Sequence, residues 1–178
     1  GGGVNKVVKR KVAFRHDVLS AGTAGNGIIT ALYEDESSMV WVGARSDILL
    51  LWDKKTGKQY SYKELEVLKD ISREGNAVQA IIKHRRTGSI WLGTRYDGVY
   101  VVECDEAKPV SLMRLRDEYP SLRNINALSQ DTVGRVWIAT EQGLFIGNTV
   151  NSRKFLVQPV EILNDTINHE CVQTLLCD

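Results

Sequence analysis

Val40-Trp41-Val42-Gly43-Ala44 is the first of three closely similar pentapeptides in this chain. Ile90-Trp91-Leu92-Gly93-Thr94 and Val136-Trp137-Ile138-Ala139-Thr140 follow it, at tryptophan spacings of 50 and 46 residues. Each copy comes directly after a polar turn. Self-similarity with a period of roughly 20 to 50 residues is typical of propellers, solenoids and other repeat architectures. The repeat therefore decides the fold class before any single motif is considered.

Strand-like runs flank every pentapeptide, and turn residues separate them. The runs that precede the pentapeptides are residues 29–33, 78–82 and 125–128. The runs that follow as third strands are residues 48–52, 97–102 and 142–146. The predicted fourth strands are residues 59–62, 110–113 and 155–157. Four antiparallel strands in about 47 residues is the size of one propeller blade, so we predict an all-β propeller of four-stranded blades.

Aligning the copies divides the chain into blades. Residues 1–20 are expected to end one blade, with residues 2–7 as a strand, and residues 161–178 to begin another, with 172–176 as its first strand. The complete blades are predicted at residues 21–66, 67–114 and 115–160. Because the period is interrupted at both ends, we expect an incomplete segment of a larger propeller, whose open edges pair with other sequence or another molecule.

Specific residues are expected to shape the contact between blades. Each tryptophan is large enough to fill the wedge between neighbouring sheets. Gly43 and Gly93, two residues later, permit close approach of another backbone, which Ala139 permits less well. The spacing of Lys-Glu-Leu-Glu-Val-Leu within residues 63–70 is compatible with a helix, but the segment is short. We therefore predict the end of a strand and a crossover there, with residues 116–123 as the equivalent loop.

Composition excludes several classes of function. Lysine and arginine number 23 against 22 acidic residues, so no net field favours nucleic acid or an anionic membrane. No run approaches the roughly 18 apolar residues of a membrane-spanning helix. Cys104, Cys171 and Cys177 form no C-x-x-C pair and are expected to be buried free thiols. The three histidines, His16, His84 and His169, lack metal-ligand spacing, so no metal or cofactor is expected.

The third copy has the most informative wording. Residues 131–140 read Asp-Thr-Val-Gly-Arg-Val-Trp-Ile-Ala-Thr, Gln-Gly-Leu follows at 142–144, and residues 119–128 supply a Tyr-Pro-Ser lead-in and an apolar strand. This pattern resembles the two-component regulator propeller repeat, and residues 14–20 resemble its connection between blades. The copies depart from that repeat in two places. His84 stands near the expected aspartate in a turn one residue longer, with Arg85 and Arg86, and Ser46-Asp47 replaces a Gly-Gly pair.

The resemblance implies a function. Such repeats form the extracytoplasmic sensor of bacterial hybrid two-component proteins, which combine a histidine kinase and a response regulator, and many respond to oligosaccharides. It therefore implies a periplasmic, non-enzymatic sensing segment whose kinase lies elsewhere in the chain. The implied partners are a small-molecule or oligosaccharide ligand, the remaining blades, and a second subunit in a homodimer.

Loops that join second to third strands gather around one mouth of a propeller. The candidate ligand-binding residues on these loops are Arg45, Arg95, Tyr96 and Glu141. An arginine fork can grip hydroxyls or a uronate carboxylate while a tyrosine stacks on a sugar face. The alternative is that these are solvated loop charges with local pairs such as Arg95 with Asp97. Asn124 and Asn126 are expected to cap the turn between blades.

Two other readings stay open. Residues 51–58, Leu-Trp-Asp-Lys-Lys-Thr-Gly-Lys, look like the strand ending of a WD-repeat interaction scaffold, although the motif occurs once. Ser129, Asp131, Gly134 and Trp137 are spaced like the Asp-box turn of sialidases with one extra residue, a structural turn. A glycosidase also needs two carboxylates facing one sugar, and nothing indicates that Glu34, Asp35 and Asp131 converge.

Overall fold

The computed structural model describes residues 28–45, 49–71, 76–106, 108–151, 154–160 and 171–176. These residues form three four-stranded antiparallel sheets, each in simple chain order, and three short 3-10 helices. The predictions for residues 2–7 and 14–20, for Ser46-Asp47, and for Cys177 lie outside the described residues.

The strands fall close to the predicted positions. The first sheet contains β1 (Ile29–Glu34), β2 (Met39–Ala44), β3 (Leu49–Asp53) and β4 (Gln59–Ser61). The second sheet contains β5 (Val78–Lys83), β6 (Ile90–Thr94), β7 (Val99–Asp105) and β8 (Lys108–Arg114). The third sheet contains β9 (Ile125–Gln130), β10 (Val136–Thr140), β11 (Gly143–Asn151) and β12 (Lys154–Pro159).

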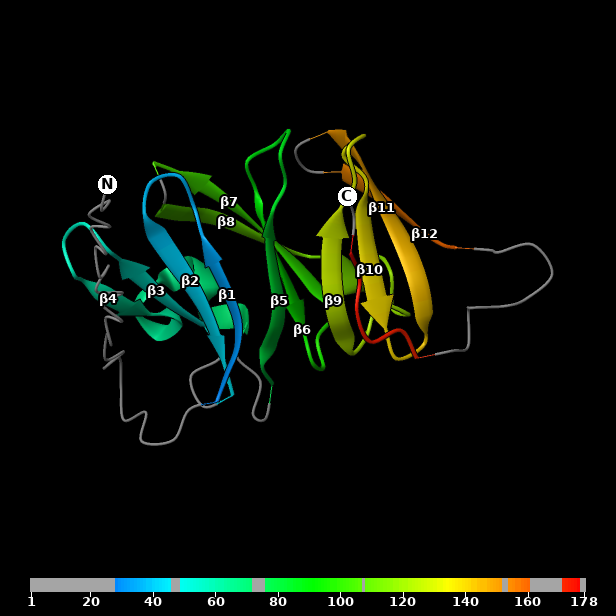
Figure 1. Cartoon of the computed structure of the whole chain (residues 1–178), viewed down its shortest axis with the longest axis horizontal. Helices are drawn as coiled ribbons and strands as arrows, with labels where there is room; N and C mark the ends of the chain where they lie inside the picture. Colours follow the sequence, from blue (N-terminus) through cyan, green and yellow to red (C-terminus); the bar gives the residue numbers. More distant parts are fainter. Residues whose placement is uncertain are drawn as a thin grey trace, which may run out of the picture.

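The sheets succeed one another in space as they do in sequence (Figure 1). The first strands β1, β5 and β9 lie next to one another in the middle, and β4 and β12 lie at the outer sides (Figure 1). The register repeats as well, because Trp41 lies opposite Tyr33 on β1, and Trp91 lies opposite Ile82 on β5. This all-β arrangement is consistent with a propeller-like fragment.

An indole fills each interface between described sheets. Trp41 is fully buried with Leu51 of its own sheet against Ile81 and Leu92 of the second sheet. Trp91 is fully buried in the same manner against the third sheet. Trp137 is only half-buried, and no described sheet covers its face. The predicted wedge role is therefore confirmed for the two tryptophans that have a following sheet.

The predicted close approach of another backbone is confirmed at Gly43, whereas at Gly93 a side chain makes the close contact. A Cβ atom on Gly43 would lie 2.5 Å from the carbonyl oxygen of Val78, at the start of β5. A Cβ atom on Gly93 would lie 2.5 Å from Cγ2 of Ile125, at the start of β9. Since real Cβ atoms do not approach other heavy atoms so closely, the sheets could not meet this tightly with a larger residue.

A polar side chain ties β1 and β9 to the segments that follow them in space. Thr30 Oγ1 donates to the carbonyl oxygen of Val78 over 2.5 Å. Asn126 Nδ2 donates to the carbonyl oxygen of Val172 over 2.8 Å, and Val172 N donates to Thr140 O over 3.0 Å. Residues 171–176 therefore run beside the third sheet, but the prediction of a strand at 172–176 is wrong. A strand needs a paired ladder, which this segment does not make with the described residues.

The prediction of a strand and crossover at residues 63–70 is wrong as well. Two 3-10 helices, η1 (Tyr62–Glu64) and η2 (Glu66–Ile71), occupy the segment. Ser61 and Glu64 form a reciprocal capping box at the start of η1. Leu68 and Ile71 are fully buried at a spacing of three, the period of a 3-10 helix.

The loop predicted at 116–123 begins inside the third helix, η3 (Leu115–Asp117). Among the described residues, none of the helices is long and apolar enough to span a membrane.

Asp131 organises the turn between β9 and β10. Its carboxylate accepts hydrogen bonds from the backbone N of Val133 and Arg135, at 3.2 and 2.9 Å. It also accepts from Arg135 Nε at 2.7 Å and from Trp137 Nε1 at 3.0 Å. Asp35 holds the β1–β2 turn through the backbone N of Met39 at 3.0 Å. These aspartates are committed to turns, as the Asp-box comparison indicated.

The indole nitrogens show how the copies have diverged. Trp91 Nε1 donates to Ser89 Oγ over 3.2 Å. Trp41 Nε1 is buried and has no partner among the described residues. Met39 stands two residues before Trp41, where Ser89 stands before Trp91, and a thioether is a weak acceptor. The first repeat therefore contains a buried indole N–H that has no hydrogen-bond acceptor among the described residues.

We predict that Gly93→Ala lowers the free energy of unfolding by roughly 1–3 kcal/mol, because the added methyl overpacks the contact with Ile125. Chemical denaturation monitored by tryptophan fluorescence measures the change, with the exposed Lys58→Ala as control. Equal stability of the two variants would show that the sheets can separate without cost.

We predict that Asp131→Asn flattens the acid limb of the stability profile. Burial raises the pKa of Asp131, but hydrogen bonds from Trp137 and Arg135 outweigh it and lower this pKa from 3.8 to about 2. Since the folded-state pKa lies below the unfolded one, the stabilisation is complete above about pH 4 and disappears as the pH falls through about 2. Thermal unfolding between those pH values should show a steeper loss for the wild-type chain than for the variant; parallel curves would contradict the assignment.

Candidate ligand-binding site

The ends of the second strands β2, β6 and β10 lie along one edge of the structure, at the bottom of Figure 1, here called the mouth edge. The residue after each second strand donates its backbone N to the residue just before the first strand of the same sheet. The pairs are Arg45 to Ile28 at 3.0 Å, Arg95 to Ala77 at 2.9 Å and Glu141 to Asn124 at 3.2 Å. Arg45, Arg95 and Glu141 therefore occupy equivalent, exposed positions on three successive sheets.

Arg95 and Tyr96 form the one pair of predicted site residues that share a turn. The guanidinium carbon of Arg95 lies 5.2 Å from the centroid of the Tyr96 ring, a cation–π distance. Tyr96 is 41% exposed, so its ring remains accessible to solvent. An arginine held over an aromatic ring offers both a charged fork and an apolar surface.

A buried polar network fixes the turn that carries this pair. Asn76 Oδ1 accepts from the backbone N of Tyr96 at 3.1 Å and of Ala77 at 3.0 Å. Arg116 Nη1 donates to Tyr96 O at 3.0 Å and to Asp97 Oδ1 at 3.1 Å. Asn76 and Asp97 are 1% and 3% exposed. The backbone beneath Arg95 and Tyr96 is therefore preorganised.

Sequence reasoning did not find Asn76 and Arg116, and it paired Asp97 with Arg95. The structure instead pairs Asp97 with Arg116 and places Arg95 over Tyr96. A signal was present, since an aspartate in an Asp-Gly turn that is buried must have a partner. The identity of that partner could not be predicted, because it depended on how residues about 20 apart in sequence meet in space.

Glu141 is tied within its own sheet. Asn124 Nδ2 donates to Glu141 Oε2 over 2.5 Å, and Asn124 adopts φ of 50°, a left-handed conformation that asparagine tolerates. Asn126 Nδ2 donates to Val172 O, so the two side chains bind a glutamate and the C-terminal segment, and the prediction that they cap the turn between blades is wrong. The mouth edge thus carries cations on the first two sheets and a carboxylate on the third.

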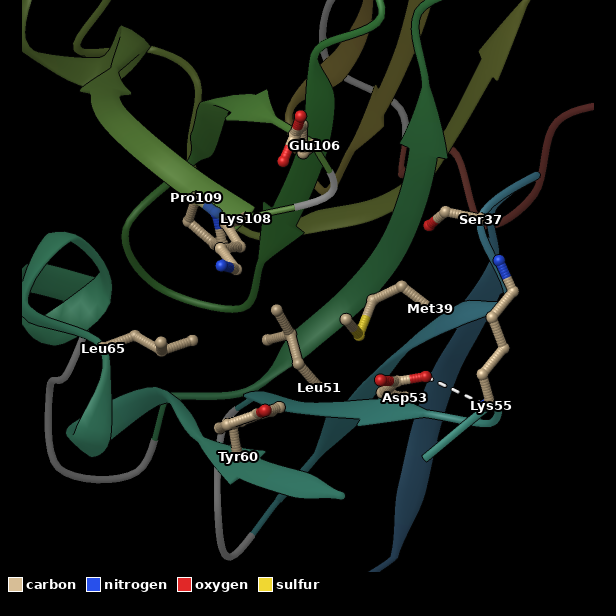
Figure 2. A pocket seen from close by; sticks show the side chains of 10 residues that line it. All are labelled: Ser37, Met39, Leu51, Asp53, Lys55, Tyr60, Leu65, Glu106, Lys108 and Pro109. Carbon is tan, nitrogen blue, oxygen red and sulfur yellow. Dashed lines mark hydrogen bonds between the residues drawn. The ribbon is translucent and has the colours of Figure 1, made fainter. Parts of the chain in front are cut away.

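A pocket that the sequence did not indicate lies between the first two sheets (Figure 2). It has a volume of about 340 Å³, and its floor is apolar. The floor residues are Met39, Leu51, Tyr60 and Leu65. Charged residues at its rim are Asp53, Lys55, Glu106 and Lys108. The pocket can hold a small apolar group with a polar substituent. Its lining comes from two different sheets, which is why the sequence did not indicate it.

The two cysteines in the described part of the chain differ in their exposure. Burial raises the pKa of the half-buried Cys104 to about 11, which keeps the thiol protonated. Cys171 is free but exposed, so the expectation of a buried thiol is wrong there. Within the described ranges, no group of three or more His, Cys, Asp or Glu side chains gathers to hold a metal ion.

We predict that Asp97→Ala costs roughly 2 kcal/mol of stability and loosens the Arg95–Tyr96 turn, because Arg116 and Asn76 lose a buried acceptor. Denaturation gives the first value, and amide hydrogen exchange at residues 94–98 gives the second. The exposed Asp105→Ala is the control. If the two variants behaved alike, the network would not hold the turn.

Comparison with known proteins places the fold. No protein-family model and no curated protein matches the sequence. Among the solved structures with a similar fold are two extracellular domains assigned to hybrid two-component systems of B. thetaiotaomicron. The first has a TM-score of 0.55 and 16% identity over 84% of this chain and 18% of its own length. The second has a TM-score of 0.52 and 21% identity over 74% of this chain and 17% of its own.

The chain therefore spans less than a fifth of the length of either of these domains. At these identities the likeness concerns the fold alone. These two structural neighbours are extracellular domains described as parts of hybrid two-component systems.

Proposed function

We propose that the three sheets are consecutive blades of a β-propeller in the periplasmic, ligand-sensing region of a two-component sensor. The observation that carries the proposal is the repeated device between sheets. Trp41 with Gly43, and Trp91 with Gly93, make the same contact at two successive interfaces. The similarity to extracellular sensor domains supports the same assignment.

The remaining blades of the parent propeller are the first proposed partner. Trp137, Leu144, Ile146 and Leu156 lie on the face of the third sheet that points away from the second, since alternate residues share a face. Leu156 is 53% exposed, and the other three are half-buried. A further sheet, packed beside residues 171–176, would cover this apolar face. The bond from Asn126 to Val172 supports this position, because it matches the bond from Thr30 to Val78.

An oligosaccharide is the proposed ligand, and the mouth edge is its proposed site. Sugars are bound by planar hydrogen-bond donors combined with aromatic faces, and Arg95 with Tyr96 supplies both on a fixed turn. Arg45 occupies the equivalent position one sheet earlier. Glu141, oriented by Asn124, adds an acceptor for hydroxyl groups.

Signalling is proposed to follow from a shift in population. A ligand that binds one arrangement of two sensor subunits more tightly than another favours that arrangement. The change then reaches a histidine kinase outside this segment. The segment itself is proposed to bind and not to catalyse.

We predict that Arg95→Ala, introduced into the complete sensor, weakens binding of its oligosaccharide roughly tenfold or more, because a charged hydrogen-bond donor is lost. A panel of neutral and uronate-containing oligosaccharides, titrated by calorimetry, tests this, with Lys58→Ala as the matched control. Autophosphorylation measured with the same ligands tests the coupling to the kinase.

Unchanged affinity of Arg95→Ala for every responsive oligosaccharide would remove the mouth edge as the site. Binding that leaves autophosphorylation unaltered would remove the signalling role while leaving the binding site intact.

A further inference from the structure

The turn between β5 and β6 departs from its two counterparts. The backbone N of Asp35 donates to Met39 O, and that of Asp131 donates to Arg135 O, four residues on. In the second sheet the equivalent bond runs from His84 to Ser89, five residues on. The extra length brings in Arg85 and Arg86, although a shorter turn closes the other two hairpins. Departures of this kind from an otherwise consistent pattern tend to mark functional positions.

The longer turn is fixed to the third sheet. His84 is fully buried, and its Nδ1 accepts from the backbone N of Thr87 at 3.2 Å. Its Nε2 therefore carries the proton and lies 3.1 Å from the carbonyl oxygen of Gly134. Burial lowers the pKa of His84, which keeps the ring neutral at neutral pH. The backbone N of Arg85 donates to Gln130 Oε1 at 2.9 Å.

A cavity of about 760 Å³ lies beside this turn, at the edge opposite the mouth edge. Side chains from all three sheets line it. They include Tyr33, Glu36, Lys83, Arg85, Arg86 and Gln130. Three of them are cations and one is a carboxylate, so the lining has an excess of positive charge. This volume is in the range of pockets that hold small organic molecules.

The positive charge in this cavity is only partly compensated. Lys83 forms an ion pair with Glu36. Arg86 donates to the backbone carbonyl of Thr149 at 2.9 Å, which leaves its charge unpaired. The guanidinium of Arg85 makes no ion pair or hydrogen bond with any residue of the described ranges. Arg85 thus stands on a fixed backbone with its planar donor fork available.

We propose that this cavity, the turn pocket, is a second binding site, distinct from the mouth edge, for a small organic oxyanion. The carboxylate, sulfate or phosphate group of the ligand binds the Arg85 fork, and Arg86 adds charge. The apolar part of the ligand rests on the wall formed by Tyr33, Ile82 and Leu128.

The test is calorimetric titration of the protein at low ionic strength and neutral pH. The probes are sulfate, phosphate and acetate, each compared with its aromatic counterpart: phenyl sulfate, phenyl phosphate and benzoate. We expect saturable binding of one anion type, tighter for the aromatic member, and weaker in added salt because the site is exposed. Arg85→Gln should weaken it roughly tenfold to a hundredfold.

Arg123→Gln removes the same charge from an exposed arginine elsewhere and should leave the affinity unchanged. Arg95→Ala should also leave it unchanged, which separates the turn pocket from the mouth edge. Equal weakening by Arg85→Gln and Arg123→Gln would mean that only the overall charge of the protein matters, which would contradict a site at Arg85. Absence of saturable binding for every probe would also overturn the proposal. Thermal unfolding of Arg85→Gln verifies that any loss of binding occurs in a folded chain.

Discussion

The contact between successive sheets imposes the constraint on which the rest of the structure depends. The first strands of the three sheets lie close together, and the fourth strands β4 and β12 lie at the outer sides, so each interface widens outwards (Figure 1). Residues two apart on a strand share a face, and Trp41 and Gly43 therefore both point at the second sheet. The glycine lets β5 approach, and the indole fills the wider space. One short segment thus sets both the spacing and the tilt of a neighbouring sheet.

The turns that follow the first strands all need an acceptor for backbone N–H groups, and different side chains supply it. Asp35 and Asp131 receive backbone N–H groups with a carboxylate, whereas His84 receives one with a ring nitrogen. The motif at residues 51–58 is explained in the same way, since Asp53 accepts from the backbone N of Lys55 and from Thr56 Oγ1. A scaffold of WD-repeat type is not needed to account for it. Such a turn can close with different residues, provided that the side chain supplies a hydrogen-bond acceptor.

The sequence was sufficient for the parts of the fold that repeat. Alternating strands, the buried tryptophans and the close contacts at Gly43 and Gly93 could all be predicted, because each appears more than once and each copy checks the others. Residues 62–71 could not, because the connection that they begin, between β4 and β5, differs in length and sequence from its counterpart after β8, residues 115–124. The helices in residues 62–71 depend on burial of Leu68 and Ile71, which tertiary packing supplies. Likewise, Asn76, Asp97 and Arg116 meet only after the second sheet has folded.

The same distinction explains where function can arise on such a scaffold. Packing fixes the residues on the faces of the sheets, so those positions have little freedom to vary. The ends of the strands are not under this constraint, and there the copies differ most: Arg45 and Arg95 against Glu141 at one edge, and His84 with two arginines against an aspartate at the other. A side chain at such an end is useful only if its backbone is held still. Buried or half-buried partners do this at both edges, Asn76 and Arg116 beneath Tyr96, and His84 and Gln130 beside Arg85. Polar residues buried near a strand end therefore identify the loops on this scaffold whose backbone is held in place.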